Sequence, residues 1–231
     1  MRVALVVTAL CAAALPALAA YQVRFVPVRV APYYEVGEQR ADRPRVATHS
    51  GFDRPLASSR PEDIVKVRDA IKAAPDSVTP ITMMVLAMRS YDVGMRDESV
   101  FWFYAARDRM ATAAAVLETE YAEVYRIEAA TRAFALRGGP TINGYAMCDV
   151  DRYKRIRREA LDWVEKNPYA TIFLETIPAR PGDRRSHLAR SLRELRAEVE
   201  EEAAALGKPE EVAKRVAARR EAEAEEKYCW K

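Results

Sequence analysis

The stretch TPITMMVLAMRSYDVG, residues 79–94, decides what kind of fold this chain adopts. Thr79-Pro80 is a typical helix start, because proline suits the first helical position and a threonine oxygen can cap the first turn. Apolar residues then occupy nearly every side of the predicted helix, which indicates a helix buried among others. Gly94 is a typical helix end. We therefore expect a mostly α-helical protein, with an irregular core of packed helical hairpins over residues 61–182.

The segment after residue 94 predicts more of this core. Asp97 can cap a helix that continues to about residue 136, either as one bent helix or as two. Gly138-Gly139-Pro140 is expected to stop it, because glycine and proline disfavour the interior of a helix. Asp149 or Asp151 can then cap a further helix. The Gly-rich stretch from Gly138 to Tyr145 is therefore predicted to be an inter-helix loop.

The C-terminal part, residues 183–231, has a different pattern. Apolar residues recur there at spacings of three and four on an otherwise charged helix, at Leu188, Leu192, Leu195, Val199, Ala203 and Leu206. This is the narrow seam of a coiled coil. Gly207-Lys208-Pro209 breaks it, and a second charged helix follows from Glu210 to Lys227. We expect a charged helical hairpin, either packed on the core or projecting from it as a lever.

The N-terminus has the pattern of a cleaved signal peptide over residues 1–19. A positive start precedes an apolar run, and Ala17-Leu18-Ala19 provides small residues at a cleavage site. The run is shorter than the roughly 20 apolar residues that span a bilayer, and no later stretch is long and apolar enough. Residues 20–60 are rich in proline and are predicted to form an extended arm. These features predict a periplasmic or secreted protein without stable membrane insertion.

Cysteine usage agrees with export. Loss of the signal segment removes Cys11 and leaves Cys148 and Cys229 as the possible partners of one disulfide. Such a bond would attach the C-terminus to the core. The formal net charge of +3 is too small to predict a nucleic-acid partner.

Metal and cofactor chemistry find no support in the sequence. His49, His187 and the two cysteines lack the spacing of zinc ligands, and no nucleotide-binding motif is present, so we expect neither metal nor cofactor. The weak candidate for catalysis is Glu98. Glu98-Ser99 resembles the catalytic Glu-Ser pair of lytic transglycosylases, which implies a general acid that acts on glycan. No Gly-Leu-Met-Gln stretch follows it, and no second motif of that family appears.

The four consecutive aromatic residues 101–104 are the most distinctive feature of the chain. Because successive residues point about 100° apart on a helix, some of these side chains are expected to face a neighbour and some a groove. Trp102 and Tyr104 are predicted binding residues, since tryptophan and tyrosine are favoured at protein interfaces. Asn143 and Tyr145 are predicted to contribute from the loop.

A short match to a repeat family points the same way. Leu86, Tyr91 and Gly94, followed by residues 100–106 with Phe103-Tyr104, are similar to one helix-turn-helix unit of Sel1-like or tetratricopeptide repeats. The resemblance implies protein binding by a concave helical surface. It covers about 20 residues and has no second copy, whereas a solenoid needs about three. The match therefore supports a helical hairpin and not a repeat protein.

Three functions remain open from the sequence. The first is an exported, non-catalytic protein that binds another protein, such as an inhibitor or an immunity protein. The second is an envelope glycan hydrolase or lyase with Glu98 as acid. The third is a structural protein that oligomerises through the C-terminal seam. The sequence leaves the oligomeric state open.

Overall fold

The computed structural model describes residues 52–229. The signal segment and most of the predicted arm lie outside the described residues. The helices, in chain order, are α1 (Asp53–Leu56), α2 (Pro61–Ala73), α3 (Pro80–Asp92), α4 (Arg96–Val116), α5 (Ala122–Ala146), α6 (Val150–Lys166), the 3₁₀ turn η1 (Ala170–Phe173), α7 (Arg184–Ala205), α8 (Pro209–Glu221) and α9 (Ala224–Tyr228). No β-strand forms within residues 52–229, so the predicted mostly α-helical fold is confirmed.

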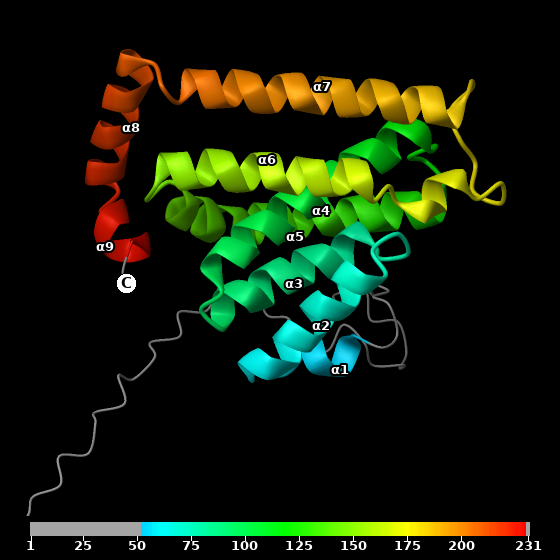
Figure 1. Cartoon of the computed structure of the whole chain (residues 1–231), viewed down its shortest axis with the longest axis horizontal. Coiled ribbons are helices and arrows are strands. Elements are labelled where there is room, and N and C mark those ends of the chain that lie inside the picture. Colours follow the sequence, from blue (N-terminus) through cyan, green and yellow to red (C-terminus); the bar gives the residue numbers. More distant parts are fainter. Residues whose placement is uncertain (1–51, 230–231) are drawn as a thin grey trace, which may run out of the picture.

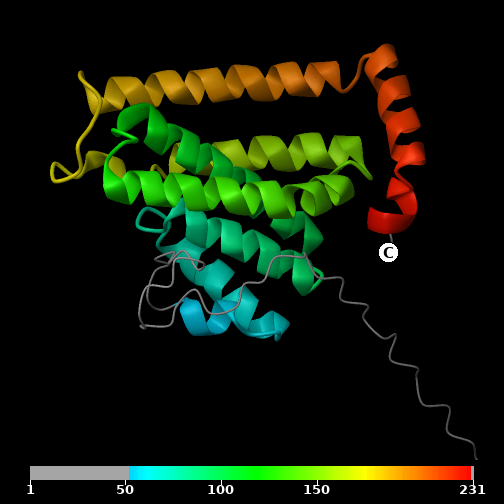
Figure 2. The ribbon, with the colours of Figure 1, turned by 180° about the vertical axis from the view of Figure 1, so that it is seen from behind.

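The long helices are stacked in layers. Figure 1 shows α7 along one side, α6 and α4 next to it, and α3, α2 and α1 toward the opposite side. Figure 2 shows the same order from behind, with α5 in front and roughly parallel to α6 and α7. Helix α4 contacts α3, α5, α6 and α7, so it lies at the centre of the bundle.

Helix α3 is buried over its whole length, as its sequence predicts. Every residue from Pro80 to Asp92 is buried. The side chain of Thr79 caps the helix by accepting a hydrogen bond from the Thr82 N–H, at 3.2 Å. At the other end, Gly94 adopts a φ of 84°, and its N–H donates to the Tyr91 carbonyl. This glycine cap ends the helix where the sequence predicts.

Buried charges connect the layers of the bundle. The Arg109 guanidinium is fully buried and donates to the carbonyl oxygens of Pro75, Val78 and Asn167, at 2.6, 2.9 and 2.7 Å. Burial lowers the pKa of Arg109 to about 10, so it stays charged at neutral pH. The three bonds join the connection between α2 and α3 to the end of α6.

The segment from residue 98 to residue 136 forms two helices. Helix α4 ends at Val116, and α5 begins at Ala122. Between them, Leu117 forms an isolated bridge with Ala179, and the Glu118 N–H donates to the Pro178 carbonyl. The break is therefore held by a segment that is distant in the sequence.

Helix α5 contradicts the prediction of a loop between Gly138 and Tyr145. The helix continues through Gly138-Gly139-Pro140 to Ala146. Gly144 allows close packing, because a Cβ there would lie only 2.6 Å from the Tyr228 ring, whereas a Cβ at Gly139 would make an ordinary contact of 3.4 Å with Phe103. We infer that tertiary packing offsets the hydrogen bond that Pro140 cannot donate, which costs roughly 3 kcal/mol in an isolated helix.

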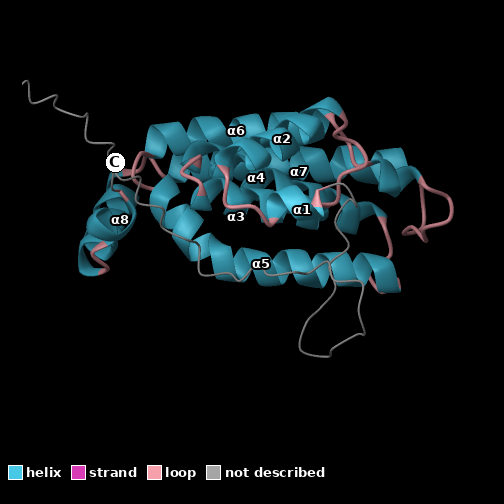
Figure 3. Ribbon diagram, turned by 90° about the horizontal axis from the view of Figure 1, so that it is seen from below, coloured by secondary structure: helices cyan, strands magenta, loops and turns pink. Residues whose placement is uncertain are grey.

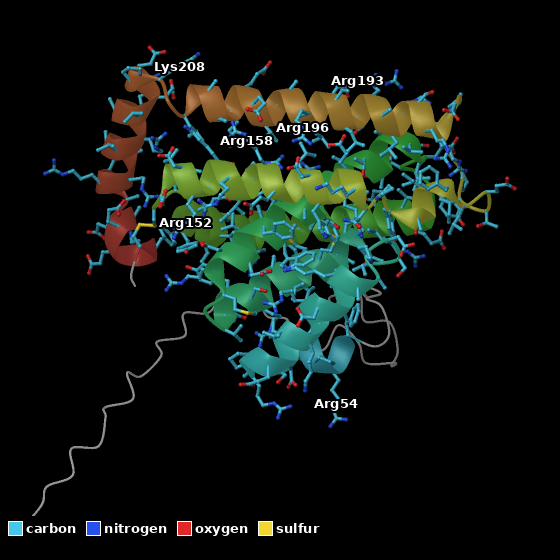
Figure 4. The ribbon with its side chains drawn as sticks, in the orientation of Figure 1. Arg54, Arg152, Arg158, Arg193, Arg196 and Lys208 are labelled. Atoms are coloured by element: carbon cyan, nitrogen blue, oxygen red, sulfur yellow. A yellow bond between two sulfur atoms is a disulfide. The ribbon has the colours of Figure 1, made fainter. Side chains whose placement is uncertain are left out.

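The apolar seam of α7 is used within the chain. Leu195, Val199 and Ala203 are buried, and α7 packs on α4 and α6. Ion pairs join α7 to α6 along the edge of this contact, where Figure 4 labels Arg158 and Arg196. The seam is therefore covered at its centre by α4 and α6, and Leu188, Leu192 and Leu206 stay partly exposed.

The C-terminal hairpin differs from the prediction in its geometry. Helix α8 leaves the end of α7 at a corner and runs past the ends of the stacked helices, and does not fold back along α7 (Figure 1). No residue of α8 is buried. Helix α9 then contacts α5, and Cys229 is bonded to Cys148, with a Cα–Cα distance of 5.5 Å. The predicted cysteine pair is thus present, and it attaches the C-terminus to the core.

A carboxylate at the start of α2 leads to a prediction about the stability of the protein at low pH. The Asp63 carboxylate accepts hydrogen bonds from Ser58 and Arg60, at 2.7 and 2.9 Å, and these contacts, led by that from Ser58, lower its pKa from 3.8 to about 2. Because the pKa is lower in the folded protein, the Asp63 carboxylate stabilises the folded state at every pH above its pKa in the unfolded chain. This contribution is lost as the pH falls toward 2. Wild type is therefore expected to lose more stability between about pH 5 and pH 2 than Asp63→Asn, as measured by denaturation followed by circular dichroism.

The control for this experiment is Asp151→Asn. The Asp151 side chain is 97% exposed, so its removal should leave the acid dependence unchanged. Equal acid dependence in wild type and Asp63→Asn would show that Asp63 contributes nothing.

Candidate functional site

A groove with a volume of about 600 Å³ lies where two chain turns meet the end of α9, and we call it the disulfide groove. Its walls come from the turn between α3 and α4, the turn between α5 and α6, and the C-terminus. Its lining residues are Arg68, Gly94, Met95, Arg96, Asp97, Glu98, Tyr145, Cys148, Asp149, Arg152 and Cys229. Figure 4 shows Arg152 close to the disulfide at this end of the molecule.

The first turn of α4 supplies the acidic side of the groove. Helix α4 begins at Arg96, with Met95 at the cap position, so Asp97 is not the cap that the sequence predicts. Asp97 instead lies in the first turn, where the helix dipole favours a negative charge. Its carboxylate is then available to accept a hydrogen bond across the groove.

Tyr145 is the central side chain of the groove. It is half-buried, and its hydroxyl donates to Asp97 Oδ1 at 2.7 Å. The guanidinium groups of Arg96 and Arg152 lie 5.0 and 4.6 Å from the centroid of its ring. Burial, together with the bond to Asp97, raises the pKa of Tyr145 to about 12. Tyr145 is thus a neutral hydrogen-bond donor at physiological pH, held between two cations.

Glu98 is engaged in contacts to the neighbouring helix. Its carboxylate accepts a hydrogen bond from Trp102 Nε1 at 3.0 Å and one from Lys72 Nζ at 3.2 Å. The Arg68 guanidinium lies 3.7 Å away. The contacts with Lys72 and Arg68 connect α4 with α2, whereas Trp102 lies on α4 itself. The geometry therefore gives no support to Glu98 as a proton donor to glycan.

Trp102 and Tyr104 lie in the core and are not available to a partner. Trp102 is fully buried and packs edge-on against Trp163, with the ring centroids 5.2 Å apart. Tyr104 is 6% exposed, and its hydroxyl donates to Asn143 Oδ1 at 3.1 Å. Helix α4 is surrounded by four helices, so most of its aromatic side chains face a neighbour. Of the four predicted binding residues, only Tyr145 lines the groove.

Sequence reasoning missed the basic side of the groove. Arg68, Arg96 and Arg152 come from three different helices, and no spacing in the sequence brings them together. The backbone N–H of Arg152 donates to the Asp149 side chain, which caps α6, at 2.9 Å. Within residues 52–229, no group of three or more His, Cys, Asp or Glu side chains is arranged to hold a metal ion.

None of the helices in residues 52–229 combines the length and the apolar character that a bilayer crossing requires.

Comparison with known proteins gives little further information. No protein-family model and no solved structure matches this chain. The chain is similar to a protein of Haemophilus influenzae that is described as an uncharacterized protein, with 29% identity over 224 residues. The alignment covers 97% of this chain and 86% of that protein, so the similarity is not confined to one hairpin. That description carries no activity that could be transferred to this chain.

Proposed function

We propose that this protein is exported and binds another protein, without catalysis, in the periplasm or outside the cell. An inhibitor or an immunity protein is the kind of role that fits. The observation that carries the proposal is the disulfide groove, in which Tyr145 is held between Arg96 and Arg152. A rigid tyrosine flanked by arginines is the composition favoured at the centre of protein interfaces.

The charges of the groove favour a polypeptide as ligand. Three arginines, Arg68, Arg96 and Arg152, face three carboxylates, Asp97, Glu98 and Asp149, so the lining is close to neutral. A nucleic-acid site needs uncompensated positive charge to bind phosphates. The arginines of the groove are hydrogen-bond donors and its carboxylates are acceptors, and they lie close together. This mixture matches the donors and acceptors of a protein segment.

The disulfide supports the proposed location. Such bonds persist in oxidising compartments and are rare in the cytosol, where thiols are kept reduced. Both cysteines line the groove, so its shape depends on the oxidised state. The signal pattern of residues 1–19 points to the same compartments.

Site-specific photo-crosslinking in the native host tests the proposal. A photoreactive amino acid replaces Arg96 in the full-length chain, and the control carries it at Arg193, which is exposed on α7 away from the groove (Figure 4). We expect a discrete adduct with one protein from position 96 and none from position 193. Adding Arg152→Glu should reduce this adduct several-fold, because it reverses a charge beside Tyr145.

Two results would contradict this function. One is the absence of any adduct from the groove while the protein is folded and oxidised. The other is the same set of adducts from both positions, which would indicate random collisions. Clearing of peptidoglycan by the purified protein, lost in Glu98→Gln, would instead favour the glycan-cleaving alternative.

A further inference from the structure

The outer face of α5 carries an apolar stripe that the rest of residues 52–229 leaves exposed. The inner face of α5 is already buried through Val124, Thr131, Phe134 and Ile142, among others. A surface helix of a monomer needs one such face. Figure 3 shows α5 along the margin of the bundle, with one side turned away from the other helices.

Two large side chains of this stripe are exposed. Tyr125 is 62% and Leu136 is 70% exposed, and both line one hollow of about 490 Å³ together with Ala129 and Ala133. The residues are spaced four, four and three apart, so they lie in line along about 16 Å of helix. Single exposed apolar residues are ordinary, but two large ones aligned in one hollow mark an interaction site.

The charges on this stripe are complementary to themselves. Glu128 and Arg132 line the same hollow, and within residues 52–229 neither makes an ion pair. If a second α5 lies antiparallel on the first, with the two-fold axis close to residues 130 and 131, each Glu128 lies beside the Arg132 of the other copy. Tyr125 then faces Leu136, and the alanines at the centre let the helices approach closely. A parallel arrangement would place like charges together.

We propose that this face binds a second copy of the chain, forming a symmetric dimer through antiparallel α5 helices. Two-fold dimers are the commonest assemblies of identical chains, and they require a patch that is complementary to itself. The stripe has this property in both its apolar and its charged residues. The interface lies on a different face from the disulfide groove, so it leaves the groove open to the partner proposed above.

Sedimentation of the purified, oxidised protein over a wide range of concentration tests the dimer. We expect the mass to rise with concentration from that of a monomer toward twice that value. Leu136→Asp should abolish the rise. The matched control is Leu174→Asp, a change at a residue that is 50% exposed but lies off α5, and it should dimerise as wild type does.

Charge reversal tests the antiparallel arrangement. Glu128→Arg and Arg132→Glu are each expected to weaken dimerisation about tenfold, because each places like charges across the interface. The double variant Glu128→Arg/Arg132→Glu should regain the wild-type dissociation constant, since the ion pairs are restored with exchanged signs.

A monomer at every concentration would overturn the proposal. Equal loss of the dimer in Leu136→Asp and Leu174→Asp would overturn the assignment to α5. Failure of the double charge reversal to restore dimerisation would exclude the antiparallel arrangement. Circular dichroism of each variant confirms that it is folded.

Discussion

Loss of the Cys148–Cys229 bond is expected to lower the free energy of unfolding by about 4 kcal/mol, because the two cysteines lie 81 residues apart and the bond restricts a long loop of the unfolded chain. This is a large part of the roughly 5–15 kcal/mol that stabilises a typical domain. Urea denaturation of the oxidised protein and of Cys148→Ser/Cys229→Ser measures the difference.

The same change should release α8 locally. This helix has no buried residue, and it is held by the corner after α7 at one end and by α9 with its disulfide at the other. Amide hydrogen exchange is therefore expected to accelerate in α8 and α9, and much less in α3, whose residues are all buried. The reduced wild-type protein is the control for effects of the serines. Equal stability of the oxidised and reduced forms would contradict this account.

Replacement of Arg157 by methionine is expected to destabilise the protein by about 3–5 kcal/mol. The Arg157 guanidinium donates two hydrogen bonds to the Asp108 carboxylate, and both side chains are less than 10% exposed. Methionine keeps much of the volume but leaves a buried carboxylate without a cation. Thermal or urea denaturation of Arg157→Met measures the cost.

A neighbouring residue provides the matched control. Arg158 makes a similar two-bond contact with Glu200, but both side chains are over 40% exposed. Arg158→Met is therefore expected to cost less than about 1 kcal/mol. The double variant Asp108→Leu/Arg157→Met should recover most of the loss, because it removes both buried charges. If Arg157→Met and Arg158→Met cost the same, burial does not set the strength of the pair.

Much of the candidate site could not be predicted from the sequence. Tyr145 and both cysteines were recognisable as unusual residues in their context, and they do line the groove. Trp102 and Tyr104, which the sequence offered as binding residues, are buried in the core. A run of aromatic residues indicates that a large area is buried, but not which neighbours bury it. The arginines of the groove come from helices that only the tertiary structure brings together.

The sequence alone predicted the helix ends at which the capping residue bonds to its own neighbours in the chain. Thr79 and Asp149 cap helices and Gly94 ends one, because those bonds span a few residues. The apolar pattern of residues 80–92 also sufficed, since it leaves no polar face for solvent. By contrast, the tertiary structure alone decided that α5 passes Gly138-Gly139-Pro140, where the helix packs on α3 and α4. The close packing of distant segments outweighed a local preference that, in an isolated chain, would have ended the helix.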